Sequence, residues 1–389
     1  MSDPVRKGRA GSYTWDASTT TPEEGTSRMR FHIVNLPHTQ TTYAYSWCAY
    51  TQKVVKLCNM LMSLGHEVYL YSGWENEAAC TEHVTVVTPA DHAAWWPGVD
   101  YGGKKPPFFG FWSAKDPCWA TMNERVVREV TKRAMLSDVV GIIAGNCQGP
   151  LTGIGLACAE WGVGYEGVMG PEIPKAWESY AWRHYVHGMM RDHALRPLDR
   201  VIPNSFELKH FPAGTGGDHF VFLGAFVRVK GVERAAATCR ALGARLVVAG
   251  QGVRHAEKGR IVSDEGWEIT GDVEYIGVVN PEQRARLLGG AKAAFVGTTY
   301  LGPFEGVAVE AMLCGTPVFT TDWGVFAETV QHGVTGFRCN SAEELLEAAK
   351  NVGRLDRAKV REWAMRYTTD QVRHEYEAWF KAILAARQR

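Results

Sequence analysis

The amino-acid sequence predicts an α/β protein made of two Rossmann-like domains that face each other across a cleft. Short apolar runs alternate with segments of helical periodicity, in one series that begins at Met29 and in a second that begins near Arg200. Such alternation is typical of parallel sheets covered by helices. The polar segment DHALRPLDR separates the two series, and 389 residues are enough for two hydrophobic cores.

We therefore divide the chain into four parts: a leader at 1–28, an N-terminal domain at 29–195, a C-terminal domain at 200–368 and a final helix at 369–389. The first 28 residues are polar and have no apolar stretch like that of a secretory signal, so we expect a mobile leader. No run approaches the roughly 18 to 20 apolar residues that a transmembrane segment needs.

The first series starts with the strand RFHIVNLPH, a polar loop and the helix CAYTQKVVKLCNMLMSLG, in which Val54, Leu57, Leu61 and Leu64 share one face. The same patterns predict the strands EVYLYSG, HVTVVTP, VVGIIAG and GYEGVMG. They also predict the helices NERVVREVTKRAML, LTGIGLACAEWG and AWESYAWRHYVHGMM. Residues 90–118 form an aromatic, Pro- and Gly-rich insertion, which is typical of a lid, a binding loop or a docking surface.

The second series predicts the strands RVIPNS, HFVFLGAFV, RLVVAGQG, VEYIGVV, AAFVGTT and PVFTTDWG. Helices are expected over 231–242, over 281–290 and at VAVEAMLCG. Ligands of doubly wound domains bind beyond the carboxyl ends of the strands. The cleft between the two domains is therefore the expected site.

Bulk composition narrows the function only a little. Forty-two basic and 42 acidic residues balance, so charge gives no support for binding nucleic acid through its phosphates, although a local basic groove stays open. The nine cysteines form no CxxC pair, which favours reduced thiols in a cytoplasmic protein. The histidines show no HExxH spacing, and no D-x-D pair occurs. We expect no metal site.

The segment Gly302 to Pro317 (GPFEGVAVEAMLCGTP) is the most informative part of the chain. A predicted strand enters a Gly- and Pro-containing loop, and a helix leaves it at about Gly306. Helix N-termini attract phosphates through free N–H groups and partial positive charge. Glu310, in the first turns of this helix, either accepts from two ribose hydroxyls or only complements the helix dipole.

This segment resembles the signature of retaining glycosyltransferases of the GT-B fold, family 4 (glycosyl transferases group 1) type, which reads E-P-F-G-G-V-A-V-E-A-x-x-C-G-T-P-V. The matching residues are Pro303, Phe304, Gly306, Val307, Glu310, Ala311, Cys314, Gly315, Thr316 and Pro317. Further matches, in family order, extend the resemblance over roughly residues 29–385; they include FLGAFVRVKGV, VVAGQG and VEYIGVVNPEQRARLL.

The resemblance implies a donor site and its residues. Glu310 would hold the donor's ribose, the backbone of Gly306 and Val307 would contact the diphosphate, and Lys230 would bind the same group. The backbone of Ile276 and Val278 would read the nucleotide base. Gly224, Gly250 and Phe304 complete the expected donor-binding set. The final helix would cross back to brace the N-terminal domain.

Two departures from the family pattern affect the expected chemistry. Where the family has a glutamate near the donor sugar this chain has Gly302, and an acid stands instead at Glu305, where the family has glycine. Ala225 replaces a family arginine on the diphosphate, and Arg228 either supplies the missing cation or is a solvated surface residue. Our catalytic candidates are Lys230, Arg228, Glu305 and His38.

The acceptor-side candidates follow strands of the N-terminal domain. They are Thr41, Thr42, Trp47 and Asn146, with Gln148 comparable to Asn146. His38 either contacts the acceptor or the leaving phosphate, or is a structural histidine. The aromatic residues between 95 and 112 either stack on a sugar or belong to the core.

The sequence thus predicts transfer of a sugar from a nucleoside-diphosphate sugar, UDP- or GDP-linked, with retention and without a metal. The nucleotide sugar is a co-substrate, and no other cofactor is expected. The acceptor stays open among a saccharide, a protein, a small molecule and a modified nucleic acid base. A non-catalytic GT-B protein that binds a nucleotide sugar or a glycan is the alternative, and a nucleotide-sugar epimerase is a second.

Overall fold

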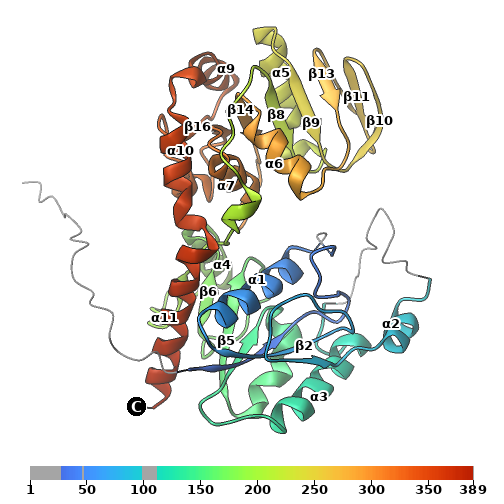
Figure 1. The fold of residues 1–389 in the computed structure, drawn as a ribbon, viewed down its shortest axis with the longest axis vertical. Helices are drawn as coiled ribbons and strands as arrows, with labels where there is room; N and C mark the ends of the chain where they lie inside the picture. The colour runs from blue at the N-terminus through green and yellow to red at the C-terminus, as the bar shows by residue number, and fades with distance from the viewer. Residues whose placement is uncertain (1–27, 46–47, 99–111, 389) are drawn as a thin grey trace, which may run out of the picture.

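The computed structural model describes residues 28–45, 48–98 and 112–388. Two α/β domains are stacked along the long axis of the molecule, the C-terminal one above the N-terminal one in Figure 1. The predicted leader up to residue 27, the acceptor-side candidate Trp47 and residues 99–111 of the aromatic insertion lie outside the described residues.

The N-terminal domain contains, within the described residues, a seven-stranded parallel sheet of order β3-β2-β1-β4-β5-β6-β7. Its strands are β1 Arg30–Val34, β2 Glu67–Ser72, β3 Glu82–Thr85, β4 Val139–Ile142, β5 Ala157–Val163, β6 Lys175–Trp177 and β7 Arg200–Val201. Its helices are α1 Ala49–Ser63, α2 Pro89–Trp95, α3 Pro117–Thr131 and α4 Tyr180–Met190, with a 3-10 segment at Gly145–Ile154.

The C-terminal domain has a six-stranded parallel sheet of order β13-β9-β8-β14-β15-β16 in the described part of the chain. Its strands are β8 Phe220–Leu223, β9 Leu246–Ala249, β13 Val273–Tyr275, β14 Ala293–Val296, β15 Val318–Thr320 and β16 Gly336–Arg338. Its helices are α5 Val232–Leu242, α6 Pro281–Gly289, α7 Gly306–Leu313, α8 Phe326–Thr329, α9 Ala342–Asn351 and α10 Arg357–Ala364.

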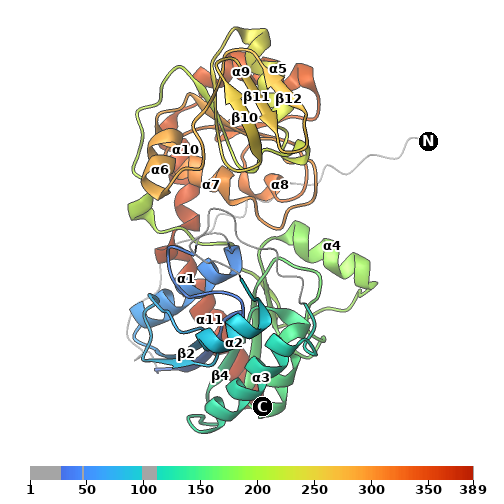
Figure 2. The same cartoon turned by 90° about the vertical axis from the view of Figure 1, so that its right-hand side faces the viewer.

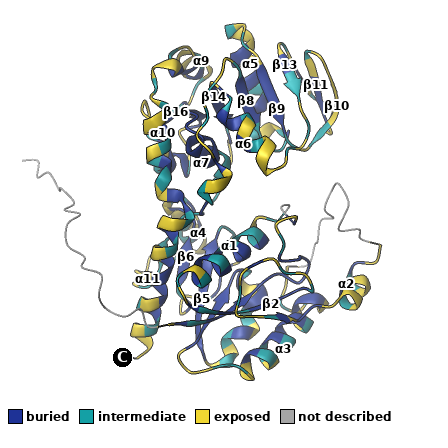
Figure 3. Cartoon of the chain, in the orientation of Figure 1, coloured by how far each residue is buried: buried dark blue, intermediate teal, exposed yellow. Residues whose placement is uncertain are grey.

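The central strands of both sheets are dark blue in Figure 3, because they are buried on both faces. In the N-terminal domain Phe31, Ile33 and Val34 of β1 are completely buried, as are Val54 and Leu61 on the inner face of α1. Apolar runs on central parallel strands are buried on both sides of the sheet, which is why they were legible in the sequence.

Several segments differ from the sequence prediction. The start of the predicted helix AWESYAWRHYVHGMM belongs to strand β6, and the helix begins only at Tyr180. RVIPNS does not open the second domain: its strand, β7, pairs with β6 and closes the first sheet. LACAEWG is not helical but supplies β5, which lies between β4 and β6. GYEGVMG contains no strand. The small residues Ala157, Ala159 and Gly162 suit close packing inside a sheet, and their spacing alone does not separate that arrangement from a helix.

The C-terminal domain also carries a small antiparallel sheet that the sequence prediction did not include. Its strands, inserted between β9 and β13, are β10 Val253–Glu257, β11 Arg260–Ser263 and β12 Glu268–Thr270. Trp267, just before β12, stacks on Phe226 with ring centroids 4.6 Å apart. The insertion therefore packs on the loop that follows β8.

Helix α11, Thr369–Arg387, leaves the C-terminal domain and runs down the side of the N-terminal domain (Figure 1). Phe380 lies 4.8 Å from Phe31, centroid to centroid, and Trp379 Nε1 donates to the carbonyl of Leu198 at 2.7 Å. The last helix thus ties the two domains together. Among the described helices, none combines the length and hydropathy of a membrane-spanning segment.

Replacing Phe380 with alanine tests this tie. The ring is fully buried, and truncating a buried phenylalanine costs about 3–5 kcal/mol. We expect a clearly lower urea midpoint, measured by tryptophan fluorescence. His374→Ala, on the exposed side of the same helix, should stay within about 0.5 kcal/mol of the unchanged protein. Equal midpoints for the two variants would contradict a docked α11.

Candidate functional site

The loops that follow β8, β9, β13 and β14 meet at one edge of the C-terminal sheet. Gly224 N–H donates to the carbonyl of Ala249 at 3.0 Å, and Gly250 N–H donates to the carbonyl of Gly277 at 3.0 Å. A side chain at Gly250, which has φ 138°, would overlap the carbonyl of Gly224. The two glycines therefore let three strand ends close into one floor at the carboxyl edge of the sheet, where such domains bind ligands.

Glu305 stands at the N-cap position of α7 in a left-handed conformation, with φ 59° and ψ 62°. A non-glycine residue in that region costs on the order of 1–3 kcal/mol and is kept only where its surroundings hold it. Lys230 supplies the holding contact: its Nζ lies 2.9 and 2.8 Å from Glu305 Oε1 and Oε2. The Glu305 side chain is 8% exposed and that of Lys230 24% exposed.

Gly302 makes room for this carboxylate. A Cβ built at Gly302 would collide with Glu305 Oε1 and would lie 3.1 Å from its Cγ and Cδ. The carboxylate of Glu305 therefore occupies the space that a side chain at position 302 would take. The glycine at 302 and the glutamate at 305 are therefore physically one change, because the acid at 305 fills the space left by the missing side chain at 302.

Lys230 is held close to the start of α7 by a tight turn. Gly231, with φ 79°, approaches Gly297 so closely that any side chain would overlap its carbonyl. Lys230 Nζ also lies 4.8 Å from the ring centroid of Tyr300. Burial lowers the pKa of Lys230, but the carboxylate of Glu305 and the hydroxyl of Tyr300 outweigh it, so the net shift is upward. The lysine is a permanent cation.

The first turn of α7 adds N–H groups beside this cation. The N–H groups of Gly306 and Val307 have no acceptor within the helix, as at every helix start. Gly306 packs against Phe206, where an added Cβ would lie 3.4 Å from Cζ. Phe304 is 2% exposed and packs between Phe206 and Tyr367, at centroid distances of 6.2 and 5.7 Å. The buried ring of Phe304 thus anchors the loop before α7 to the core.

Glu310 lies one turn further into α7 and is 8% exposed. Its Oε1 is 3.1 Å from Arg284 Nη1 of α6, and its Oε2 is buried without a hydrogen-bond partner among the described residues. Ile276 and Val278, in the loop before α6, are 42% and 59% exposed. The acceptor oxygen thus lies on the helix whose start carries Glu305, and the exposed loop follows β13 at the same edge of the sheet.

Arg228 is not brought to this group. Its Nη1 pairs with Glu233 at 2.8 and 3.0 Å, and its guanidinium lies 5.2 Å from the ring centroid of Trp267. The short 3-10 turn Arg228–Lys230 directs the two cations to different neighbours. The structure therefore places Arg228 at the surface, where it pairs with Glu233 and is not directed toward Lys230 and Glu305.

The N-terminal candidates divide by burial. His38 is 6% exposed and lies edge-on to Trp96 and Trp112 at 6.2 and 5.7 Å. Burial, with a smaller contribution from His92, lowers the pKa of His38 to about 4, so its ring is neutral near pH 7. Thr41 is buried and accepts from Asn35 Nδ2 at 2.8 Å.

The remaining acceptor-side candidates differ in exposure. Thr42 is half-buried, and its carbonyl accepts from Gln52 Nε2 at 2.9 Å. Asn146 is exposed. Gln148 is buried, and its Oε1 accepts from the N–H groups of Ile143 and Ala144 at 2.8 and 2.9 Å. Asn146 and Thr42 therefore have surface that a ligand could contact, whereas the side chain of Gln148 is bonded to the backbone just after β4.

The sequence analysis missed the contacts that hold the two domains together at this site. Ser179 Oγ donates to the carbonyl of Pro303 at 2.7 Å. The carboxylate of Glu328 accepts from the N–H groups of Tyr180 and Ala181 at 2.9 and 2.7 Å. Figure 2 shows α8 of one domain above the start of α4 of the other. The loop that carries Glu305 is thus bonded to the N-terminal domain.

A second group of contacts between distant segments holds the chain that connects the two domains. Glu178 is 2% exposed, is paired with Lys53 of α1, and accepts from Asn204 Nδ2 at 2.9 Å. Ser179 carries a readable signal, since a serine before a helical run is a common N-cap. Arg284, Glu178 and Glu328 carry none in the sequence, because their partners lie on other elements.

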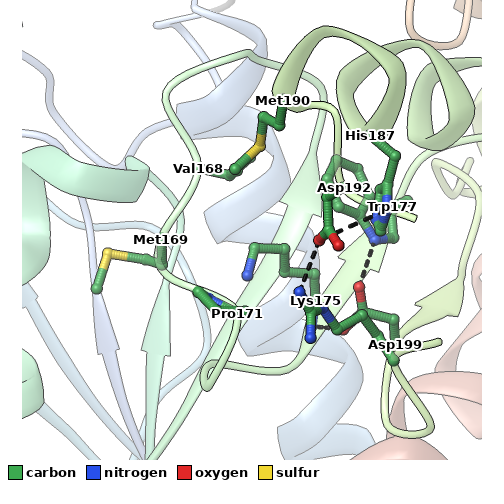
Figure 4. A pocket seen from close by; sticks show the side chains of 10 residues that line it. Val168, Met169, Pro171, Lys175, Trp177, His187, Met190, Asp192 and Asp199 are labelled. Atoms are coloured by element: carbon green, nitrogen blue, oxygen red, sulfur yellow. Dashed lines mark hydrogen bonds and ion pairs between the residues drawn. The ribbon is translucent and has the colours of Figure 1, made fainter. Parts of the chain in front are cut away.

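A pocket of about 220 Å³ beside β6 is not part of this site. Figure 4 shows Lys175, Trp177, Asp192 and Asp199 around it. Trp177 Nε1 and the N–H of Lys175 both donate to Asp199, at 2.9 and 3.0 Å, so these polar groups are occupied by one another.

In the described part of the chain, no group of three or more His, Cys, Asp and Glu side chains is placed to hold a metal ion.

Residues 217–354 match the family model of glycosyl transferases group 1. The C-terminal domain is a group 1 glycosyltransferase domain. The matched range begins just before β8 and ends just after α9, and it contains Lys230, Arg284, Glu305 and Glu310.

Solved structures resemble the whole chain. Sucrose-phosphate synthase from Thermosynechococcus elongatus has a TM-score of 0.64 at 16% identity and covers 92% of this chain and 100% of its own. AviGT4, a glycosyltransferase involved in avilamycin A biosynthesis, has a TM-score of 0.59 at 21% identity, covering 92% and 98%. HepE from Anabaena, solved with UDP and glucose, has a TM-score of 0.59 at 13% identity and covers 91% of this chain and 100% of its own. The predicted GT-B fold and group 1 domain are therefore confirmed.

A curated relative matches over a shorter stretch. Sucrose synthase 2 of Pisum sativum is 41% identical over 66 residues, which are 16% of this chain and 8% of that protein. This chain therefore spans only a small part of the length of the curated relative that it matches.

The two cations at the edge of the group 1 domain give a direct test. Lys230→Met should weaken binding of UDP or GDP about 10- to 100-fold, because a hydrogen bond to a charged group contributes roughly 1.5–3 kcal/mol. Arg228→Met is the matched control and should change affinity less than about 2-fold. Titration calorimetry measures both. Equal losses for the two variants would show that Arg228 also serves the diphosphate.

Proposed function

We propose that this protein transfers a sugar from a nucleoside-diphosphate sugar to an acceptor, with retention of the anomeric configuration and without a metal ion. The observation that carries the proposal is the grouping, on one edge of the group 1 domain, of Lys230, the start of α7 and the unpartnered oxygen of Glu310. Lys230 and the start of α7 suit a diphosphate, and the oxygen of Glu310 suits the ribose attached to it.

The spacing along α7 supports this assignment. Gly306 and Glu310 are four residues apart, which is about 6 Å of helix rise. A diphosphate on the N–H groups of the first turn would therefore leave its ribose beside the carboxylate of Glu310. The exposed loop at Ile276 and Val278 would lie under the base.

Donor binding requires an exchange of partners at Lys230. In the structure the lysine is neutralised by Glu305, so an arriving diphosphate must take over the ammonium group. Glu305 then becomes free to accept hydrogen bonds from hydroxyls of the donor sugar. This gives Glu305 the place that the family glutamate would have had at 302, since its carboxylate already fills that space.

The same cation would assist the chemical step. As the bond between sugar and diphosphate breaks, negative charge grows on the leaving oxygen, and Lys230 and the N–H groups of α7 are fixed where they stabilise it. A leaving-group oxygen would take the acceptor's proton on the side from which the diphosphate departs, which gives retention. The bonds from Ser179 and Glu328 would keep the N-terminal domain closed over the reaction and exclude water.

A non-catalytic nucleotide-sugar-binding protein is the second candidate, favoured by Ala225. With no arginine there and Arg228 bound elsewhere, one lysine alone faces the diphosphate. A planar guanidinium binds two oxygens at once, so a lysine alone stabilises the leaving diphosphate less than an arginine and a lysine together would.

An exchange of the acid between two positions tests the enzymatic proposal. Release of UDP or GDP from a panel of nucleotide sugars is measured for the unchanged protein, for Glu305→Gly and for the double variant Gly302→Glu with Glu305→Gly. Glu305→Gly should lose about 10- to 100-fold, the contribution of a charge-assisted contact. The double variant should recover to within about 10-fold of the unchanged protein, because it restores an acid to the same space.

The outcomes separate the two candidates. Turnover that falls and recovers supports the enzyme with Glu305 as its sugar-facing acid. Tight nucleotide binding without turnover in any of the three proteins would favour the binding module. Turnover unaffected by Glu305→Gly would remove Glu305 from the mechanism.

A further inference from the structure

The carboxylate of Glu310 is held by one of its two oxygens. Oε1 is 3.1 Å from Arg284 Nη1, whereas Oε2 is buried and has no hydrogen-bond partner in the described part of the chain. A buried acceptor without a partner is costly and uncommon in folded proteins. A ligand's hydroxyl groups would therefore be bound favourably by Glu310 Oε2.

Arg284 comes from α6, which begins directly after the loop of Ile276 and Val278. Asn280 and Gln283 form a reciprocal capping box at its start, with distances of 2.8 and 2.9 Å, so the first turn is rigid. The guanidinium of Arg284 lies 5.5 Å from the ring centroid of Phe211. The arginine is thus held by a helix with a rigid start and by its contact with Phe211.

The pairing is one-sided. Arginine commonly binds a carboxylate with two parallel N–H contacts, but here Nη1 reaches one oxygen and Nε is buried without a partner. A two-sided pair would occupy both oxygens of Glu310. The nearby lysine of α1, Lys56, is committed elsewhere, since its Nζ donates to the carbonyl of Ser205 at 2.7 Å.

We propose that Arg284 is a positioning residue: it holds Glu310 through Oε1 and so leaves Oε2 free to accept from the ribose hydroxyls of the donor nucleotide. The proposal rests on the function proposed above. It makes a prediction of its own, because Arg284 should affect binding only through the hydroxyl groups that Glu310 accepts from. It should matter little for a nucleotide that lacks them.

The test compares each nucleotide with its 2′,3′-dideoxy counterpart. UDP, GDP and their dideoxy forms are titrated into the full chain by calorimetry. Arg284→Met should weaken the better-bound ribonucleotide about 10-fold, the equivalent of one hydrogen bond to a charged group. It should weaken the dideoxy form less than about 2-fold. The preference for ribose would then fall by about 5-fold or more.

Matched variants separate positioning from folding. Arg286→Met lies on the same helix with its side chain 72% exposed and should leave both affinities unchanged. Arg284→Lys should recover part of the ribose preference, because an ammonium group can still donate to Oε1. Glu310→Gln should reduce the preference at least as far as Arg284→Met. Thermal unfolding of each variant shows whether the fold is kept.

Each result has a distinct meaning. Equal weakening of ribo- and dideoxynucleotide by Arg284→Met would overturn the proposal and make Arg284 a general support of the site. A preference lost in Glu310→Gln but kept in Arg284→Met would also overturn it, while leaving the donor site intact. An unchanged protein that binds neither UDP nor GDP would remove the proposed function and this proposal together.

Discussion

The ion pair between Lys230 and Glu305 fixes the geometry on which the candidate site depends. It joins the turn after β8 to the start of α7, two segments that are far apart in the sequence. It also explains why Glu305 tolerates a left-handed backbone, since the carboxylate receives a half-buried cation and a space free of side-chain atoms at Gly302. Lys230, which matches the family pattern, and Gly302 and Glu305, which depart from it, therefore form one physical unit.

The unit is also connected to the other domain. Ser179 binds the carbonyl of Pro303, and Glu328 caps the start of α4. Because Pro303 lies between Gly302 and Glu305 in one short loop, any opening of the domains must break a bond to the loop that carries the acid. Helix α11 adds a second tie on the far side. Closure of the cleft and the placement of Glu305 are therefore coupled.

Much of the fold could be predicted from the sequence, because central parallel strands are buried on both faces and show continuous apolar runs. The runs that became β4, β8 and β14 are of this kind. β5 was misassigned as helix because alanine, cysteine and glycine carry little strand signal, and its burial comes from elements distant in the chain. β7 was placed in the wrong domain because two residues do not reveal their partner strand.

The site was readable wherever its chemistry is local. The start of α7 at Gly306 was predicted correctly, because the loop and the helix lie within one motif, whereas the role of Glu310 came from the family resemblance and stays a prediction. The two interpretations of Arg228 could not be separated in the sequence, because closeness to Lys230 in the chain says nothing about direction in the 3-10 turn, which points Arg228 toward Glu233 and Trp267. Arg284 could not be found, because its contact with Glu310 exists only after α6 packs beside α7.

The most direct test of this account is a crystal structure of the full chain with UDP or GDP bound. The account predicts the diphosphate on Lys230 Nζ and the N–H groups of Gly306 and Val307, with the ribose hydroxyls on Glu310 and the carboxylate of Glu305 turned away from the lysine. A nucleotide bound elsewhere, or one bound at this edge while the Lys230–Glu305 pair stays intact, would contradict it.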